Sequence, residues 1–177
     1  MPGFEVRAEE LIRSFGPQIL GYLTRVLGSR DDADDAFQLW AEDVWQGIGG
    51  LREPGAARVW AYRVAWNAAA RLRREAWQQR RQRMPTSMAS RIAAEVVSRT
   101  LGAAERETDQ LASLRKVLTA EENSLLVLRI DRELSWREVA EVMAEEGKPV
   151  DEAALRQRFV RVREKLEKLA RERGLLE

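Results

Sequence analysis

The densest group of side chains able to do chemistry is an acidic cluster, Asp31-Asp32-Ala33-Asp34-Asp35. It contains the Asp-Asp-x-x-Asp pattern with which some enzymes hold magnesium and a diphosphate, and carboxylate oxygens do suit a hard cation. That chemistry needs a second acidic motif and a deep helical barrel, and this sequence predicts neither. Two other interpretations stay open. The carboxylates suit the first turn of a helix, or Asp35 and Gln38 share a helix face that contacts another molecule.

The composition excludes several kinds of active site. The chain has 177 residues without Cys or His, so it holds no disulfide, thiol nucleophile, imidazole base or zinc finger. We expect no metal, no cofactor and no catalytic residues. No apolar run approaches the roughly 18 residues of a membrane span, and the first residues do not resemble a signal peptide. The sequence therefore predicts a cytoplasmic protein without a membrane contact, built as one domain or two small ones.

The net charge of +1 hides an alternation of acidic and basic segments. Residues 1–50 hold 4 basic and 9 acidic side chains, and residues 51–83 hold 9 basic and 2 acidic ones. The same order returns later, with 4 basic and 9 acidic side chains in residues 118–151 and 8 and 5 in residues 152–177. Each basic segment suits a polyanion, while the acidic segment before it can meet something else.

The first basic segment predicts a helix with an aromatic and basic face. Its narrow apolar seam consists of Ala61, Ala65, Ala68 and Leu72. The polar and aromatic residues opposite or beside this seam are Trp60, Tyr62, Arg63, Trp66, Asn67, Arg73, Arg74 and Trp77. Guanidinium groups among aromatic rings suit single-stranded nucleic acid, because charges follow phosphates and rings stack on bases. The alternative for each Trp is packing against a neighbouring helix.

The second basic segment predicts the last helix of a helix-turn-helix between Leu134 and Lys165. The apolar stripe of this last helix consists of Leu155, Phe159, Val162, Leu166 and Leu169. The residues away from the stripe or at its borders are Arg156, Gln157, Arg158, Val160, Arg161 and Arg163. Arg and Gln on such a helix can reach base edges in a major groove, and the remaining arginines can hold phosphates.

Helices must position all of these residues, since Ala, Leu, Glu, Arg and Gln dominate and strand-forming runs are nearly absent. The predicted helices are 8–27, 32–46, 57–83, one that ends near 118, 120–130, 135–144 and 152–173. Gly16-Pro17 predicts a break or kink, and Gly28 predicts a helix end. Ser135 with Glu138 predicts a capping box, and Asp151 an N-cap. The glycines and proline of residues 47–55 predict a loop.

In combination and order, these motifs resemble bacterial sigma factors of the extracytoplasmic-function (ECF) group. The N-terminal part resembles the region 2 of that family through Ala33-Asp34-Asp35-Ala36-Phe37-Gln38 with the later Trp45, through Trp60-Ala-Tyr-Arg-Val-Ala65-Trp-Asn67, and through Leu72-Arg73-Arg74. The C-terminal part resembles region 4 through Leu118-Thr-Ala-Glu-Glu122, Leu128-Arg129, Leu134-Ser-Trp-Arg-Glu-Val-Ala140 and Leu155-Arg-Gln-Arg-Phe-Val-Arg-Val-Arg163. The resemblance covers residues 8–83 and 112–172.

The resemblance implies an all-α fold of two small helical domains, residues 1–83 and 112–177, joined by a linker over 84–111. It implies that Asp34, Asp35 and Gln38 bind the β′ clamp helices of core RNA polymerase. It implies that the 47–55 loop together with Trp60, Arg63, Asn67, Arg73 and Arg74 captures the melted −10 promoter element. It implies that duplex DNA of the −35 element is read by Arg156, Gln157, Arg158, Arg161 and Arg163.

The implied partners are core RNA polymerase, through its β′ clamp and β flap, promoter DNA, and an anti-sigma factor or other regulator. Four features depart from the family pattern. Leu39 stands where an acid is usual, Ala41 replaces an aromatic residue, Arg71 replaces an acid, and the turn over residues 145–151 is about five residues longer. Two alternative functions stay open: a helix-turn-helix regulator that does not join polymerase, and a helical adaptor that binds only proteins.

Overall fold

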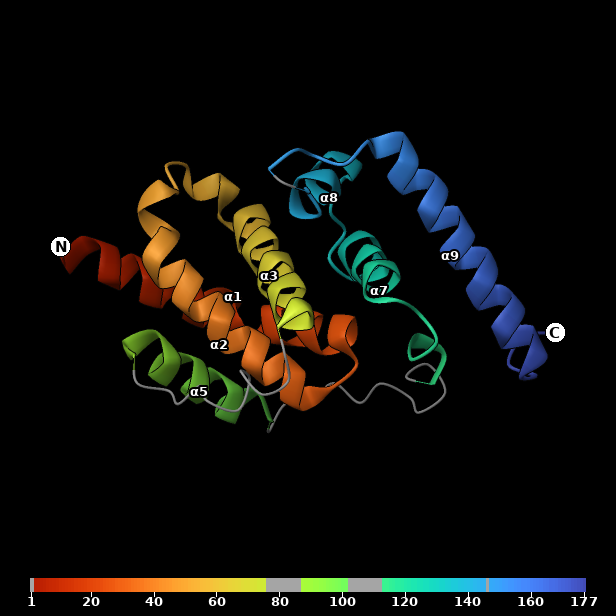
Figure 1. Cartoon of the computed structure of the whole chain (residues 1–177), viewed down its shortest axis with the longest axis horizontal. Helices are drawn as coiled ribbons and strands as arrows, with labels where there is room; N and C mark the ends of the chain where they lie inside the picture. The colour runs from red at the N-terminus through yellow and green to blue at the C-terminus, as the bar shows by residue number, and fades with distance from the viewer. Residues whose placement is uncertain (1, 76–86, 102–112, 146) are drawn as a thin grey trace. The chain divides into compact units, whose positions relative to one another are not determined.

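The computed structural model describes residues 2–75, 87–101, 113–145 and 147–177. All regular elements in these ranges are helical (Figure 1). The chain divides into two compact units, Met1–Ala104 and Glu105–Glu177. The predicted all-α fold with two small helical domains is therefore confirmed.

The N-terminal unit is a bundle of α1 (Pro2–Leu27), α2 (Arg30–Gly47), α3 (Ala57–Arg74) and α5 (Met88–Leu101), as Figure 1 shows. Two short 3-10 turns, Ile48–Gly50 and Pro54–Ala56, shape the predicted loop between α2 and α3. The largest fully buried side chains of this unit are Trp40, Tyr22, Tyr62, Phe37, Ile12, Ile19, Leu23 and Leu72. The indole N–H of Trp40 donates a 3.0 Å hydrogen bond to the carbonyl of Ala61, so α2 and α3 are joined by a buried polar contact as well as by packing.

The prediction of a break at Gly16-Pro17 is wrong, because α1 continues through both residues. Tertiary packing accounts for the continuity. A Cβ at Gly16 would lie 2.8 Å from Val96 Cγ1 and 3.3 Å from Phe37 Cζ, so two other helices pack directly on this part of α1. Gly28 does mark the end of α1, with a φ of +67° that favours glycine.

The helix predicted for residues 57–83 ends earlier in the structure. α3 ends at Arg74, and Glu75 has extended backbone angles of −73° and 140°. Residues 76–83, including Trp77, lie outside the described residues.

The segment predicted as a linker, residues 84–111, contains a packed helix. α5 buries Ala89, Ile92, Ala93 and Val96 on one face, and it contacts both α1 and α2. The first compact unit therefore extends beyond residue 83 and includes this helix. The sequence predicts a helix here that ends near residue 118, and the structure shows one that begins at Met88 and ends at Leu101.

The C-terminal unit holds α7 (Ala120–Leu126), a π-helical continuation over Val127–Asp131, α8 (Trp136–Val142) and α9 (Glu152–Glu172), labelled in Figure 1. Its core includes Leu118, Leu126 and Val162, with Phe159 and Leu166 packed against them. The predicted caps are confirmed. Ser135 and Glu138 form a complete capping box, and the Asp151 carboxylate accepts a 3.2 Å hydrogen bond from the Ala154 N–H.

The long turn between α8 and α9 closes on itself. The backbones of Glu145 and Lys148 exchange two hydrogen bonds of 3.0 and 2.8 Å, and Gly147 has a φ of +79°. The Val150 N–H then donates to the Ala140 carbonyl at 3.3 Å, which ties the chain back to α8 before α9 begins. Backbone hydrogen bonds thus hold this turn to itself and to α8.

Among the described residues, no helix combines the length and the apolar character needed to cross a bilayer.

Candidate nucleic-acid interface

The three predicted polymerase-binding residues lie together on α2. Asp34 and Gln38 are four residues apart and Asp35 and Gln38 are three apart, so their side chains share one side of the helix. Glu42 extends the same row by one further turn. All four side chains are half-buried.

Asp34 is the most constrained member of this row. Its Oδ1 atom is buried and has no hydrogen-bond partner. Burial raises the pKa of this carboxyl above its ordinary value, while the neighbouring Arg30 opposes that change. A buried carboxylate oxygen without a partner costs stability.

The first two aspartates of the acidic cluster have a structural role. Asp31 and Asp32 occupy the first turn of α2, and the Ser29 hydroxyl accepts a 3.4 Å hydrogen bond from the Asp32 N–H. Within the described residues no group of three or more acidic side chains is arranged to hold a metal ion. Leu39 and Ala41, which depart from the family pattern, both belong to the buried core.

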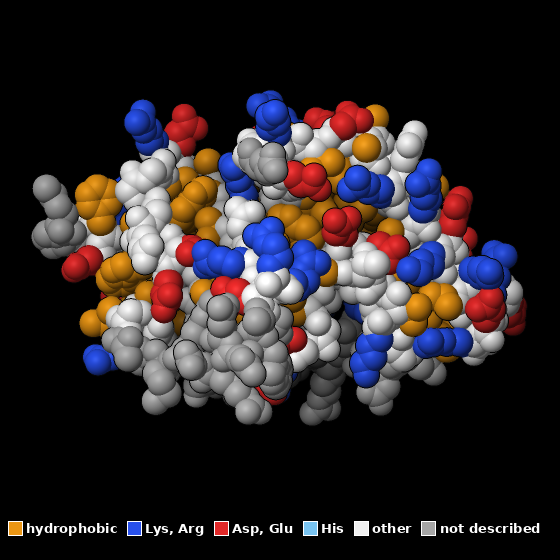
Figure 2. Space-filling view, in the orientation of Figure 1, with side chains coloured by type: hydrophobic (Ala, Val, Ile, Leu, Met, Phe, Trp, Pro, Cys, Tyr) orange, Lys and Arg blue, Asp and Glu red, His pale blue; other side chains and the backbone are white. Residues whose placement is uncertain are grey.

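The predicted DNA-facing residues of α3 differ in exposure. Arg63 and Trp60 are half-buried, whereas Asn67, Arg73 and Arg74 are exposed. The apolar seam, Ala61, Ala65, Ala68 and Leu72, is fully buried as predicted. Figure 2 shows Lys and Arg side chains gathered over the region that Figure 1 labels α3. The helix therefore presents a basic surface on a rigid, packed support.

The aromatic residues of α3 differ in how far they are packed into the bundle. Trp66 is only 7% exposed, and Tyr62 is fully buried against Tyr22 with ring centroids 5.4 Å apart. These two rings are packing residues. Trp60 remains half-buried and covers Gly47, where a Cβ would lie 3.3 Å from its Cζ2 atom. The Arg73 guanidinium lies 5.2 Å from the centroid of Trp66, so a packing residue holds a cation at the surface.

Arg71 has a different partner. Its Nη2 atom donates to both carboxylate oxygens of Asp43 in α2, at 2.9 and 3.2 Å. This ion pair joins α3 to α2 and engages the charge of Arg71 within the bundle. Local sequence patterns do not predict the pair, because the two residues lie 28 positions apart.

The loop between α2 and α3 is held by the start of α1. The Arg7 guanidinium donates a 3.0 Å hydrogen bond to the Leu51 carbonyl, and the Phe4 ring lies 3.4 Å from the position of a Cβ at Gly49. Ile48 and Leu51 are buried, whereas Arg52 and Glu53 are exposed. The loop thus presents its polar residues on an anchored backbone.

All five predicted residues of α9, Arg156, Gln157, Arg158, Arg161 and Arg163, are exposed. Two of them meet acidic side chains: Arg156 pairs with Glu152 at 3.2 Å, and Arg158 lies 4.0 Å from Glu121 of α7. No ion pair is found for Arg161 or Arg163 among the described residues. Figure 2 shows the same mixture, with basic, acidic and apolar side chains along the region of α9.

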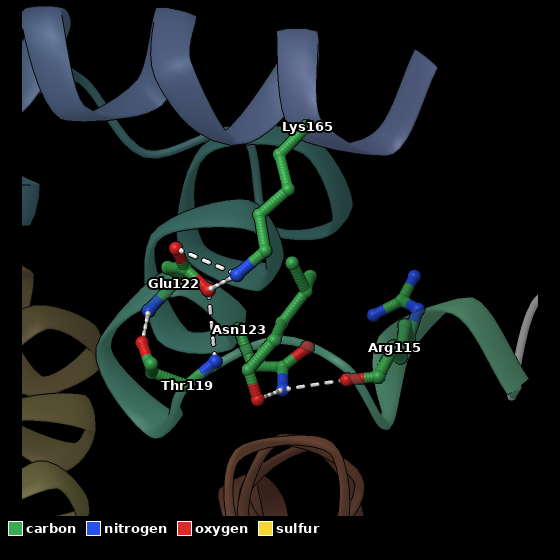
Figure 3. Close-up of polar contacts among 6 residues, drawn as sticks. Arg115, Thr119, Glu122, Asn123 and Lys165 are labelled. Atoms are coloured by element: carbon green, nitrogen blue, oxygen red, sulfur yellow. Dashed lines mark hydrogen bonds and ion pairs between the residues drawn. The ribbon is translucent and has the colours of Figure 1, made fainter. Parts of the chain in front are cut away.

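A polar network fixes α9 to the start of α7 (Figure 3). Thr119 and Glu122 form a capping box, in which the Thr119 N–H donates to Glu122 Oε2 at 2.8 Å. The same carboxylate accepts a 3.0 Å hydrogen bond from the Lys165 ammonium. Burial, the largest single influence, raises the pKa of Glu122, but the Thr119 N–H and Lys165 together outweigh it and lower that pKa below its ordinary value.

These contacts explain much of the second acidic segment. Glu122 and Glu138 cap helices, Glu121 and Glu122 face cations of α9, and Asp131 pairs with Arg115 at 3.6 Å. The Asn123 amide adds a 3.2 Å hydrogen bond to the Arg115 carbonyl (Figure 3). The acidic residues here stabilise the unit, whereas in α2 the buried Oδ1 atom of Asp34 has no hydrogen-bond partner.

Comparison with known proteins gives a family for the first unit. Residues 11–79 match the family model described as Sigma-70 region 2. The searches of curated proteins and of solved structures found no significant match to this chain. The matched residues include α2 and α3 and most of α1, and they leave out α5 and the entire C-terminal unit. Residues 11–79, which form most of the N-terminal unit, are therefore similar to Sigma-70 region 2.

Proposed function

We propose that this protein is a sigma factor that binds core RNA polymerase and directs promoter-specific initiation of transcription. One observation carries the proposal: the Sigma-70 region 2 match falls on the unit whose α3 exposes Asn67, Arg73 and Arg74 beside a half-buried Trp60. The family supports a role in polymerase binding and promoter melting. The match is to a domain of transcription factors rather than of enzymes.

The proposed polymerase contact is the Asp34, Asp35 and Gln38 row of α2. The row is anionic and lies on a helix whose other sides pack into the bundle, so a partner would meet a fixed surface. In the resemblance stated above, the partner of these positions is the pair of β′ clamp helices. The unsatisfied Oδ1 of Asp34 supports this role, since a partner that donates a hydrogen bond would remove its cost.

The proposed site for the melted −10 element is α3 together with the 47–55 loop. Arg63, Asn67 and Arg74 lie along one side of α3, with spacings of four and seven residues. Such a row can follow a strand of phosphates while bases stack near Trp60. Extruding bases from the duplex costs a few kcal/mol, and binding of the unpaired bases offsets this cost without ATP.

The proposed reader of the −35 element is α9. Arg161 and Arg163 are exposed and lack an intramolecular ion pair among the described residues, so both are available to a phosphate or a base edge. A cavity of about 260 Å³ at the other side of this unit is lined mainly by apolar residues, among them Leu126, Ile130 and Leu166. It offers a place for apolar side chains of the polymerase β flap.

Within this proposal we place the protein in the ECF group, because the sequence motifs of both units resemble that group. The test is binding of fluorescently labelled protein to core polymerase, followed by binding of the complex to promoter DNA at several salt concentrations. A helix-turn-helix regulator would bind duplex DNA without polymerase. A protein-binding adaptor would show no salt-dependent affinity for DNA in either state.

A further inference from the structure

One tryptophan of the C-terminal unit lies close to two arginines, one before it and one after it in the sequence. Trp136 is the first residue of α8, and the capping box of Ser135 and Glu138 fixes the backbone that carries it. Its side chain is half-buried. The Phe159 ring of α9 meets the Trp136 ring edge-on, with the ring centroids 5.4 Å apart. Both helices of the helix-turn-helix therefore hold the position of Trp136.

Arg129, the first of the two arginines, belongs to the surroundings that hold the ring. Its Cζ atom lies 5.1 Å from the centroid of the Trp136 ring. Its Nη1 atom donates a 2.8 Å hydrogen bond to the carbonyl of Leu134, a fully buried residue. Because this bond ties Arg129 to the backbone just before α8, its guanidinium is a fixed neighbour of the ring.

Arg156, the second arginine, lies near the start of α9. Its Cζ atom lies 5.9 Å from the centroid of the same Trp136 ring, and its side chain is 55% exposed. In helix-turn-helix proteins, the residues near the N-terminal end of the second helix contact base edges. Trp136 thus lies beside a guanidinium at the end of α9 that is expected to enter the major groove.

The ring and Glu152 hold Arg156 in different ways. The Glu152 carboxylate accepts a 3.2 Å hydrogen bond from Arg156 Nη2, and this exposed ion pair occupies an N–H donor that DNA could use. Contact with the face of a ring uses none of the five N–H donors of a guanidinium. Arg156 can therefore exchange Glu152 for a phosphate or the edge of a guanine while it stays against Trp136.

We propose that Trp136 is a positioning residue for Arg156 in the recognition of the −35 element. The inference rests on the proposed function, and it adds a residue of α8 to the DNA contact of α9. An Arg156 side chain that is already held against the ring loses less conformational freedom when it binds DNA, so the complex is tighter. A cation–π contact at an exposed site corresponds to about two- to fivefold in affinity.

The test is a double-variant cycle on the full chain in complex with core polymerase, measured as the affinity for promoter DNA with a matching −35 element. Trp136→Leu keeps an apolar side chain and removes the ring, and it should weaken binding about two- to fivefold. In the Arg156→Ala background the same change should leave the affinity nearly unaltered, because the group that the ring positions is gone. Circular dichroism checks that each variant is folded.

The matched control is the same cycle with Arg161, which is also exposed on α9. Among the described residues, the arginines found against the Trp136 ring are Arg129 and Arg156. Trp136→Leu and Arg161→Ala should therefore weaken binding independently, with fold-changes that multiply. Trp136→Phe, which keeps an aromatic ring, should retain most of the affinity.

An equal loss from Trp136→Leu with and without the Arg156 side chain would overturn the inference and leave the proposed function intact, since the tryptophan would then act without the arginine. If the wild-type complex showed no preference for a matching −35 element, the proposed function would fail and the inference with it.

A second measurement needs no variant that could fold poorly. In the NMR spectrum of the wild-type protein, the side-chain protons of Arg156 should be shifted upfield by the ring current of Trp136. The chemical shifts of an ordinary exposed arginine would overturn the inference.

Discussion

The two basic helices, α3 and α9, carry similar basic residues but differ in how much of each helix is buried. α3 has 18 residues, of which seven are buried. Two of its arginines contact residues of the same unit: Arg71 pairs with Asp43, and Arg73 lies against the Trp66 ring. α9 has 21 residues, of which three are buried, and its cations point outward along most of its length. A helix that is packed into a bundle can order flexible, unpaired bases, whereas an exposed helix can enter a groove that is already formed.

The two acidic segments differ in the hydrogen bonding of their carboxylates. In the C-terminal unit Glu122 and Glu138 complete capping boxes, and their hydrogen bonds are satisfied within the fold. In α2 the Asp34 oxygen is buried without a partner. Equal charge counts thus accompany different local environments: capping carboxylates with satisfied hydrogen bonds in one region, and one buried carboxylate oxygen without a partner in the other.

The largest expected effect comes from reversing the charge of the α2 row. Asp35→Lys/Gln38→Lys should abolish assembly with core polymerase, since like charges across an interface cost several kcal/mol. Gln46→Lys, at an exposed position near the end of the same helix, is the matched control and should assemble normally. Analytical gel filtration with core polymerase measures both, and assembly of the double variant would refute the contact assignment.

The second effect separates exposed from paired arginines on α3. Arg73→Ala/Arg74→Ala should reduce promoter opening about a hundredfold, if each guanidinium makes one charge-assisted hydrogen bond of about 1.5 kcal/mol. Arg71→Ala should leave opening largely intact and instead lower the free energy of unfolding by about 0.2–1 kcal/mol, because its partner is Asp43. Permanganate footprinting and urea unfolding distinguish the two results; a stronger opening defect in Arg71→Ala would contradict the comparison.

The third effect concerns α9. Arg161→Ala should weaken binding of the polymerase complex to a promoter with a matching upstream element by about 1–3 kcal/mol, if the side chain reads a base. Arg171→Ala, exposed in the last turn of the same helix, should change little. Anisotropy measurements with matching and mismatched DNA test this. Equal losses on both sequences would make Arg161 a phosphate contact.

The smallest effect is the acid sensitivity of the α7 cap. Because the pKa of Glu122 is lowered in the folded protein from its ordinary 4.5, its ionised form stabilises the fold above that pH, and the contribution is lost as pH falls below it. Glu122→Gln should cost about 1 kcal/mol at neutral pH, the usual size of a lost capping interaction. Below pH 4.5, the protection of α7 against hydrogen exchange should then fall less with pH in this variant than in the wild type, after correction for the intrinsic pH dependence of exchange. An unchanged dependence would exclude Glu122 as its source.

The local signals in the sequence predicted most of the helices. Ser135, Asp151 and Gly28 mark helix ends in the structure as they do in the sequence, because capping depends on a few neighbouring residues. Contacts between distant residues were not predictable in this way. Gly16-Pro17 stays helical because Val96 and Phe37 pack on it, and the packed position of α5 depends on the same contact.

The sequence predicted which residues share a helix face in the candidate site, but not which other residues they contact. The exposed residues of α9 and the shared row of Asp34, Asp35 and Gln38 follow from helical periodicity alone. Three polar contacts join residues that are far apart in the sequence. Arg71 and Asp43 are 28 positions apart, Arg7 and Leu51 are 44 apart, and Ser90 and Glu42 are 48 apart. Only the packing of helices against one another brings such pairs together.

The measurement that tests the central claim most directly is run-off transcription by core polymerase on a promoter library, with and without this protein. The account predicts that defined transcripts appear only when the protein is present, and that Arg73→Ala/Arg74→Ala removes them although the complex still forms. Transcripts that are independent of the protein, or no transcripts on any promoter despite binding to DNA, would contradict it.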